Sequence, residues 1–215
     1  MRTALITIFL TLFIDQFSKL WVKSHAILGE LIYSKGIFNL HFIENEGMAF
    51  GWSLGGIWGK LLLSSFRVIA IIVIGFVIRN LIENKLHKGL ILSVALVFAG
   101  ALGNLLDSAF YGLMFEDSAH HVAQFMPEGG GYAGFLMGNV VDMIHIEFYW
   151  PDFMPFGFGG EEVFPPIFNV ADMAVSGGVI TMLVFNKKFF GTGKGDFSVF
   201  RRNRGIKPTT DEVTN

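Results

Sequence analysis

The sequence predicts an α-helical integral membrane protein with four transmembrane helices and small β-containing outer loops. Apolar residues make up 52% of its 215 residues and charged residues only 16%, whereas an ordinary soluble domain has about 25% charged residues. The apolar residues occur in long blocks, and Lys and Arg are unevenly divided among the segments between them. The length suits a single polytopic domain over residues 1–215, with a polar tail at residues 191–215.

Four apolar segments are long enough to cross a hydrocarbon core of about 30 Å, which takes roughly 20 helical residues. These segments are residues 3–23, 60–79, 88–107 and 167–190. The first follows Arg2 and resembles a cleavable secretory signal. However, Asp15 and Lys19 interrupt it and no small-x-small cleavage site follows. We therefore expect this segment to be retained as a transmembrane helix.

The distribution of Lys and Arg predicts the orientation of the helices, because cytoplasmic loops are enriched in these residues. The segment from Ala109 to Pro166 contains neither, and the segment from Ser24 to Gly59 contains only Lys35. By contrast, basic residues recur in residues 79–88 and from Lys187 onward. The two long loops are therefore predicted to lie outside, with both termini in the cytoplasm.

Both outer segments contain predicted strands. Residues 30–44 are rich in Ile, Phe and Tyr and favour a hairpin with its turn near residues 34–36. Residues 140–149 alternate well enough to form another strand. The Gly- and Phe-rich stretches around that strand lack basic residues and suit a surface at the lipid headgroup level. The alternative for residues 110–135 is a flexible insertion without a function.

Ionisable side chains inside the predicted helices need a reason, because each costs about 2.5–3.5 kcal/mol to insert at the helix centre. Asp15 and Lys19 are four residues apart with the acid first, which is the favourable order for a helical contact. They form either a structural ion pair or part of a functional site. Lys60 can extend to the headgroups, whereas Arg67 lies deeper and needs a partner that the sequence does not identify.

Three polar clusters are predicted to converge on the outer membrane face. Asn104 and Asp107 share a helix face at the end of the third segment. Asn169 and Asp172 open the fourth segment, where they could alternatively serve only as a helix N-cap. Asp142 lies in the predicted strand between these two helix ends. The expected site is therefore built from carboxylate and amide side chains.

The residue types limit the chemistry of such a site. The sequence has no Cys, and no Ser stands in a recognisable arrangement with Lys or His. His120 and His121 are adjacent and point apart, so we predict no metal. We also predict no cofactor and, without a basic stripe, no nucleic-acid partner. Two neighbouring aspartates would share one proton, so that one activates water and the other protonates the carbonyl oxygen and leaving amine.

Five short motifs resemble, in order, the motif blocks of lipoprotein signal peptidases (signal peptidase II). These motifs are Asp15–Lys19 (DQFSK), Asn45–Phe50 (NEGMAF), Gly103–Asp107 (GNLLD), Val140–Asp142 (VVD) and Phe168–Asp172 (FNVAD). Each is weak alone, but together they extend from the first span to the last. The resemblance implies an aspartyl endopeptidase of the bacterial inner membrane. It would remove the signal peptide of prolipoproteins before a cysteine that carries diacylglycerol.

The resemblance also implies roles for individual residues. Asp142 and Asp172 would be the catalytic pair. The substrate-binding residues would be Asn45, Gly47, Asn104, Asn169, Asp15, Lys19 and Asp107. The implied partners are prolipoprotein substrates and membrane lipids, and we expect the protein to act as a monomer.

Two features depart from the family pattern. The family usually has Arg directly after the Asp of the Gly-Asn-x-x-Asp block, where this sequence has Ser108. The connections on either side of Asp142 also look longer than usual. The insert at residues 109–138 could form a lid, or Asp142 could be the wrong choice of catalytic residue. Asp117 and Asp152 are then the alternatives.

Two other functions remain open from the residues alone. A small transporter or proton-relay protein would use Asp15, Lys19, Asp107 and Asp172 as its relay. A relay needs ionisable groups throughout the membrane depth, whereas most of these cluster at one face. A non-catalytic assembly factor whose loops bind a partner has no specific support in the sequence.

Overall fold

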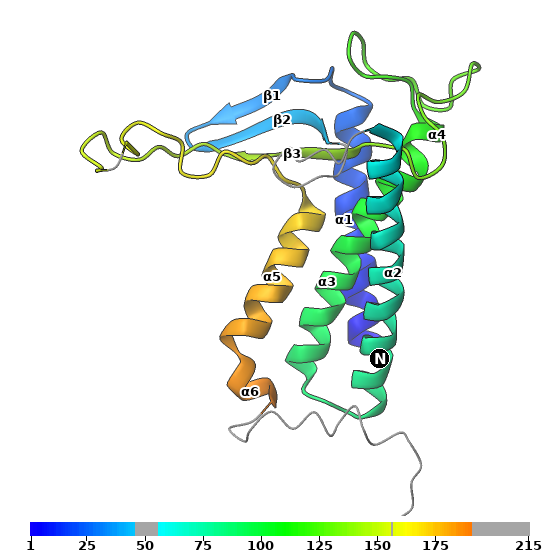
Figure 1. The fold of residues 1–215 in the computed structure, drawn as a ribbon, viewed down its shortest axis with the longest axis vertical. Coiled ribbons are helices and arrows are strands. Elements are labelled where there is room, and N and C mark those ends of the chain that lie inside the picture. Colours follow the sequence, from blue (N-terminus) through cyan, green and yellow to red (C-terminus); the bar gives the residue numbers. More distant parts are fainter. Residues whose placement is uncertain (46–55, 156, 191–215) are drawn as a thin grey trace, which may run out of the picture.

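Long helices run side by side, and a small sheet lies across one end of them (Figure 1). The computed structural model describes residues 1–45, 56–155 and 157–190. Its long helices are α1 (Arg2–Lys23), α2 (Gly56–Glu83), α3 (Lys88–Leu106) and α5 (Val170–Val184). A π-helix, η2 (Asp107–Tyr111), and the short α4 (Gly112–Met114) extend α3, and α6 (Asn186–Phe190) follows α5.

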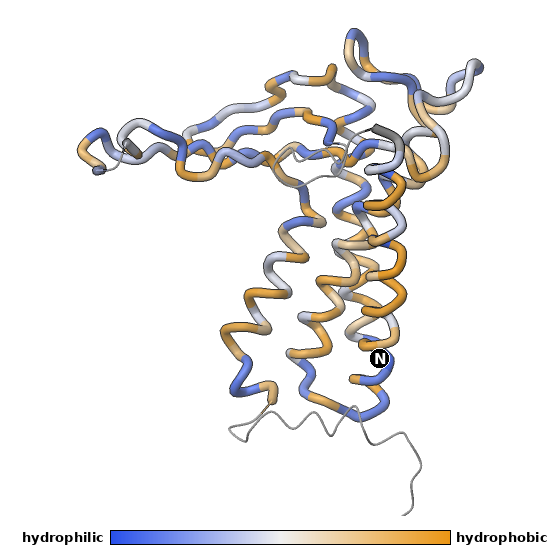
Figure 2. The backbone as a smooth tube through the Cα atoms, viewed as in Figure 1, coloured by the Kyte–Doolittle hydropathy of each residue, from blue (hydrophilic) through white to orange (hydrophobic). Residues whose placement is uncertain are grey.

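Three of these helices are long and apolar enough to cross a membrane: Arg2–Lys23, Trp58–Glu83 and Lys88–Met114. Figure 2 shows their apolar residues in orange along most of the helix length. Large apolar side chains such as Phe9 and Phe76 are 66% and 68% exposed, as expected of residues that face lipid rather than water. The structure therefore confirms a helical membrane protein with a small sheet.

The fourth predicted segment, residues 167–190, is not one continuous helix. Phe168 forms a β-bridge with Ile144, so the helix begins only after the capping residue Asn169. It ends at Val184, after 15 residues, and α6 follows. Because roughly 20 helical residues are needed to span a membrane, the count of four spans stays a prediction. The second segment is longer than predicted, since α2 extends several residues beyond 60–79 at both ends.

Glycines allow α3 to approach its neighbours closely. A Cβ on Gly100 would lie 2.2 Å from the Ala171 carbonyl oxygen of α5, and a Cβ on Gly103 would lie 2.5 Å from Asp15 Oδ2 of α1. Such distances are far inside van der Waals contact, so only a residue without a Cβ fits at either position. This close packing of small residues is typical of helices in lipid. It brings the polar ends of α1, α3 and α5 together.

The sheet has the antiparallel order β1-β2-β3. Its strands are β1 (Leu31–Lys35), β2 (Phe38–Asn45) and β3 (Val140–Ile146). The predicted hairpin and its turn are confirmed, and Gly36 has a positive φ of +64° in that turn. The other predicted strand ends at Ile146 rather than at residue 149, because Tyr149 pairs with Glu162 instead. Ile43 of β2 lies opposite Asp142, which places Asn45 close to that aspartate.

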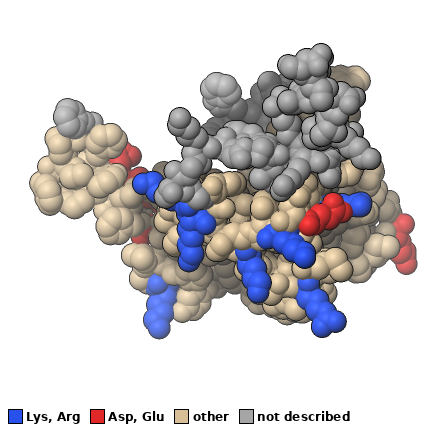
Figure 3. Space-filling view, turned by 90° about the horizontal axis from the view of Figure 1, so that it is seen from below, with Lys and Arg blue, Asp and Glu red and all other residues tan. Residues whose placement is uncertain are grey.

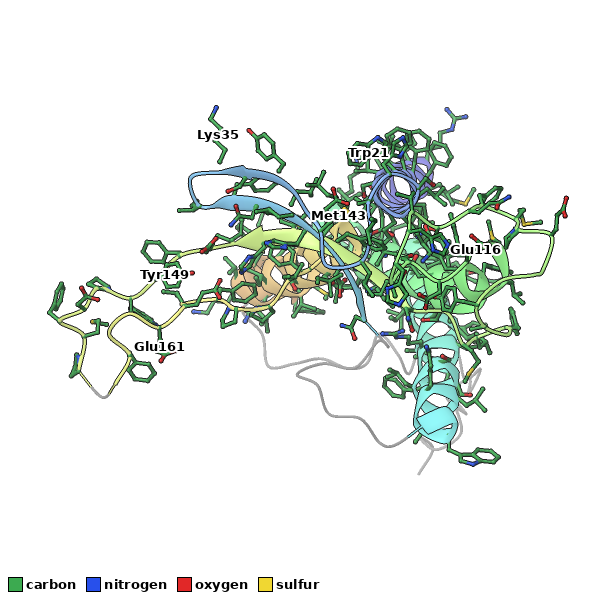
Figure 4. The ribbon with its side chains drawn as sticks, turned by 90° about the horizontal axis from the view of Figure 1, so that it is seen from above. Trp21, Lys35, Glu116, Met143, Tyr149 and Glu161 are labelled. Atoms are coloured by element: carbon green, nitrogen blue, oxygen red, sulfur yellow. The ribbon has the colours of Figure 1, made fainter. Side chains whose placement is uncertain are left out.

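The outer loops extend to opposite sides of the sheet. Figure 4 shows Tyr149 and Glu161 on an arm beyond one end, and Glu116 on the other side. The loop with Glu116 belongs to the insert at residues 109–138, and it folds against β3 and α1. Phe115 is fully buried in an apolar cluster with Val22 of α1, Phe42 of β2 and Val141 of β3. The insert is therefore packed against the sheet, which argues against the flexible insertion considered above.

Candidate active site

Lys19 lies at the centre of a buried polar cluster at the sheet end of the helices. Its Nζ forms ion pairs with Asp15 Oδ2 at 3.0 Å and Asp107 Oδ2 at 2.7 Å. The same group donates to Asn104 Oδ1 at 2.8 Å, so its three protons have three acceptors. The side chains of the ion pairs are at most 1% exposed. The predicted contact between Asp15 and Lys19 is present, with a second carboxylate from η2.

The two carboxylates that pair with Lys19 also hold the backbone of distant elements. Asp15 Oδ1 accepts a hydrogen bond from Ala171 N at 2.8 Å, in the first turn of α5. Asp107 Oδ2 accepts one from Val141 N at 3.3 Å, in β3. Each contact lies directly before one of the two predicted catalytic aspartates in the sequence. Asp15 and Asp107 therefore position the elements that carry these aspartates.

Asn169 is fully buried and contacts both predicted catalytic carboxylates. Its Nδ2 donates to Asp142 Oδ1 at 2.7 Å, and its backbone N donates to Asp172 Oδ2 at 3.2 Å. Its Oδ1 accepts from Asp172 N at 2.9 Å, which completes a capping box at the start of α5. The N-cap interpretation is therefore correct. It does not exclude a role in the site, because the capping residue also reaches Asp142.

Two further amides complete the contacts of the aspartates. Asn104 Nδ2 donates to Asp172 Oδ1 at 2.8 Å, and Asn45 Nδ2 donates to Asp142 Oδ2 at 3.2 Å. Together with Asn169, these amides give each of the four carboxylate oxygens a hydrogen bond. Such contacts restrict the rotation of both carboxylates and fix the directions in which their oxygens point.

The environment of Asp142 allows it to hold a proton near neutral pH. Its side chain is only 4% exposed. Burial is the larger cause that raises the pKa of the Asp142 carboxyl to about 7, and the charge of Asp172 adds to it. The hydrogen bonds from Asn45 and Asn169 act in the opposite direction. Two carboxylates that repel each other in a buried site can carry one proton between them.

Most of the residues predicted for the site meet in this network. Gly47 is the exception, since it lies outside the described residues. The two alternative aspartates have other surroundings in the structure. Asp117 accepts a hydrogen bond from Ala119 N at 2.8 Å within its own loop, and Asp152 is exposed on the outer arm.

The sequence interpretation missed Gln16 and Lys23. Gln16 Nε2 donates to Asp15 Oδ2 at 3.0 Å and to Asp107 Oδ1 at 2.9 Å, so it bridges the two carboxylates that flank Lys19. Lys23 is fully buried and forms an ion pair with Glu44 of β2. One signal was available for Lys23, because it follows Lys19 by four residues and so lies on the same helix face.

The structure identifies a partner of Arg67, which the sequence did not. Its Nη1 donates to Ser108 Oγ at 2.9 Å, so α2 brings a cation to the position where the family pattern has Arg. Lys60, which was expected to extend to the headgroups, instead donates to Asn139 Oδ1 at 2.6 Å. Two basic residues of α2, Lys60 and Arg67, therefore contact the segment that connects α3 to β3.

Comparisons with known proteins show similarity over most of the chain. Residues 7–187 match the family model described as Signal peptidase (SPase) II. The lipoprotein signal peptidase of Porphyromonas gingivalis is 43% identical over 183 residues, which cover 82% of this chain and 79% of that protein. The lipoprotein signal peptidase of Amoebophilus asiaticus is 34% identical over 186 residues, which cover 83% and 75%.

The fold is also similar to solved structures. Two structures of a bacterial membrane enzyme match with TM-scores of 0.60 and 0.55, each at 22% sequence identity. The first match covers 90% of this chain and 93% of the solved one, and the second covers 87% and 94%. The arrangement of helices and sheet is thus shared over most of both chains.

Proposed function

The chain belongs to the signal peptidase II family, and we propose that Asp142 and Asp172 are the catalytic pair with which it removes signal peptides from prolipoproteins. The observation that carries this proposal is the position of Asn169. This one buried residue donates to Asp142 through its side chain and to Asp172 through its backbone. The family assignment also replaces the transporter and assembly-factor alternatives.

The geometry supports a division of roles within the pair. Asp142, with its raised pKa, holds the shared proton, and Asp172 acts as the base. Asp172 takes a proton from water as the water oxygen bonds to the scissile carbonyl carbon, while Asp142 protonates the carbonyl oxygen. The tetrahedral intermediate then collapses, and the leaving amine takes the proton that Asp172 accepted. Asp142 recovers its own proton from the hydroxyl group that becomes the new carboxyl.

We further propose that the amides around the pair form the substrate wall. Asn45, Asn104 and Asn169 hold the two carboxylates by hydrogen bonds, so they border the space in which a peptide must meet the pair. Gly47 belongs to the same proposal. We also propose that the protein acts as a monomer. The site lies where helix ends meet the sheet, next to helices whose apolar side chains face outward, so the lipid chains of a substrate can stay in the membrane.

Cleavage by the purified protein is expected to depend on pH. The protein in detergent should cleave a diacylglyceryl-modified precursor at neutral pH. Its kcat/KM should fall by about tenfold per pH unit above pH about 7, because Asp142 then loses the proton that it donates. The sign follows from the raised pKa, since the protonated form exists below about 7 and is lost as pH rises. The measurement is an initial rate of precursor cleavage over a series of buffers.

The matched control is the same precursor without its diacylglyceryl group, which should be a poor substrate. Absence of cleavage of the modified precursor at any pH would reject the proposed function. A rate that stays constant far into the alkaline range would leave the protease activity standing and reject Asp142 as the acid.

We also propose that both termini lie in the cytoplasm, with the site at the outer face of the bacterial inner membrane. Figure 1 places the N-terminus and α6 at the end of the helices that is remote from the sheet. Figure 3 shows Lys and Arg side chains gathered on that end. Lys85 lies in the turn between α2 and α3 there, Lys88 begins α3, and Lys187 and Lys188 belong to α6. The enrichment of basic residues in cytoplasmic loops supports this orientation.

Reporter fusions test the orientation directly. Fusions after Lys85 and after Lys188 should report a cytoplasmic position, and fusions after Ser34 and after Gly130 should report an external one. The physical reason is that Lys and Arg are retained on the cytoplasmic side during insertion. A cytoplasmic signal from Gly130 would contradict the orientation and would place the site on the wrong side for exported precursors.

A further inference from the structure

Arg67 brings a cation from α2 to the site. The residue lies within the apolar span of α2, where an unbalanced charge is costly. Its Nη1 donates to Ser108 Oγ at 2.9 Å, and Ser108 is only 2% exposed. The guanidinium also interacts electrostatically with Asp107, Asp172 and Asp142. A half-buried Arg whose charge acts on three carboxylates of a site contributes to the charge balance of that site.

The charges of the site give this cation a function. Four carboxylates converge in the described region, from Asp15, Asp107, Asp142 and Asp172. Lys19 has its three protons engaged with Asp15, Asp107 and Asn104, and its charge is the smallest of the influences on the pKa of Asp142. The Asp142/Asp172 pair needs a further positive charge if one of its members is to stay ionised as a base in a buried site. Arg67 is placed to supply it.

A chain of hydrogen bonds connects Arg67 to the pair. Arg67 donates to Ser108 Oγ, and Ser108 Oγ donates to the Asn104 carbonyl oxygen at 3.1 Å. The side chain of the same Asn104 donates to Asp172 Oδ1 at 2.8 Å. A shift of the Arg67 guanidinium would therefore displace Ser108 and Asn104, and through Asn104 the carboxylate of Asp172. The contact is mechanical as well as electrostatic, because Ser108 and Asn104 are one helical turn apart.

We propose that Arg67 is a positioning residue of the protease site, which acts from α2 on Asp172 and Asp142 through its charge and through Ser108 and Asn104. The inference rests on the proposed function, because it assigns Arg67 a role in keeping one member of that pair ionised. It predicts two separable effects. Loss of the charge changes the titration of the pair, and loss of the planar donor group changes the position of Asn104.

The test compares Arg67→Met and Arg67→Lys with Arg79→Met. Arg79 is the matched control, because it lies on the same helix but is exposed and pairs only locally with Glu83. Arg67→Met should lower kcat for the lipid-modified precursor roughly 10- to 100-fold, with KM changed less than about twofold. The alkaline fall of its pH–rate profile should move to higher pH by roughly 1 unit, because a nearby cation favours the ionised form of Asp142 and its loss favours the protonated form. Arg67→Lys should keep the wild-type pH–rate profile and recover part of kcat.

A measurement without turnover separates this inference from the proposed function. Aspartate labelled with ¹³C at the carboxyl carbon reports the titration midpoint of Asp142, assigned by its loss in Asp142→Asn. The midpoint should rise in Arg67→Met and stay unchanged in Arg79→Met, whether or not any precursor is cleaved. An unchanged midpoint in Arg67→Met would overturn the inference while leaving the protease function intact. If the midpoint rises in Arg67→Met but the wild-type protein cleaves no precursor, only the proposed function is overturned.

Discussion

Replacement of Asp142 by Asn is expected to abolish precursor cleavage, and Asp172→Asn should have the same effect. An amide can neither take a proton from water nor deliver one to the carbonyl oxygen. General acid–base contributions are about 10²–10⁴-fold each, and members of one catalytic unit are not additive. The double replacement should therefore be about as inactive as either single one. The measurement is precursor cleavage in membranes with matched amounts of protein.

The structure explains why these variants should still fold. Asn169 can donate to the amide oxygen at position 142 as it does to Asp142 Oδ1. Asn104 can likewise donate to an amide oxygen at position 172. Both single variants should therefore keep normal membrane levels and bind precursor.

Asp117→Asn and Asp152→Asn are the matched controls and should remain active. Asp117 contacts its own loop and Asp152 is exposed on the arm, so neither change reaches the site. Substantial turnover by Asp142→Asn or Asp172→Asn would remove that residue from the pair. Turnover by both would end the aspartyl-protease mechanism for this chain.

Replacement of Lys19 by Met is expected to reduce stability more than any other single change in the site. It leaves Asp15 and Asp107 buried without the ammonium that both contact at 3.0 Å or less. Breaking a buried ion pair by removing one partner costs about 3–5 kcal/mol, because the remaining charge is uncompensated. The expected result is a lower folded yield and a lower melting temperature in detergent. Lys35→Met, in the exposed hairpin turn region, is the matched control.

Removal of the stranded charges should restore stability in steps. Asp15→Asn combined with Lys19→Met should fold better than Lys19→Met alone, and the further change Asp107→Asn should improve the yield again. This order distinguishes a structural role of the cluster from a direct role in catalysis. Equal yields for the single and double variants, with activity lost in both, would favour a direct role for Lys19.

Local sequence properties were sufficient to predict the helices and the hairpin. Membrane helices depend on about 20 successive apolar residues, and the hairpin depends on a short turn at Gly36, so each can be predicted from its own segment. The polar residues of the site were also predictable, because ionisable groups such as Asp15 and Lys19 are conspicuous within an apolar run. The residue at which the fourth helix starts could not be predicted from its own segment, because the capping box at Asn169 and the bridge at Phe168 depend on β3 and the site.

The contacts that organise the site required the tertiary structure. Asp15 holds the backbone of Ala171, 156 positions later in the sequence. Arg67 reaches Ser108 across the space between two helices, 41 positions apart. No periodicity or hydropathy pattern within a segment records such pairings, because they depend on how closely the helices pack. Gly100 and Gly103 allow that close approach, and the resulting distances decide which buried charges compensate one another.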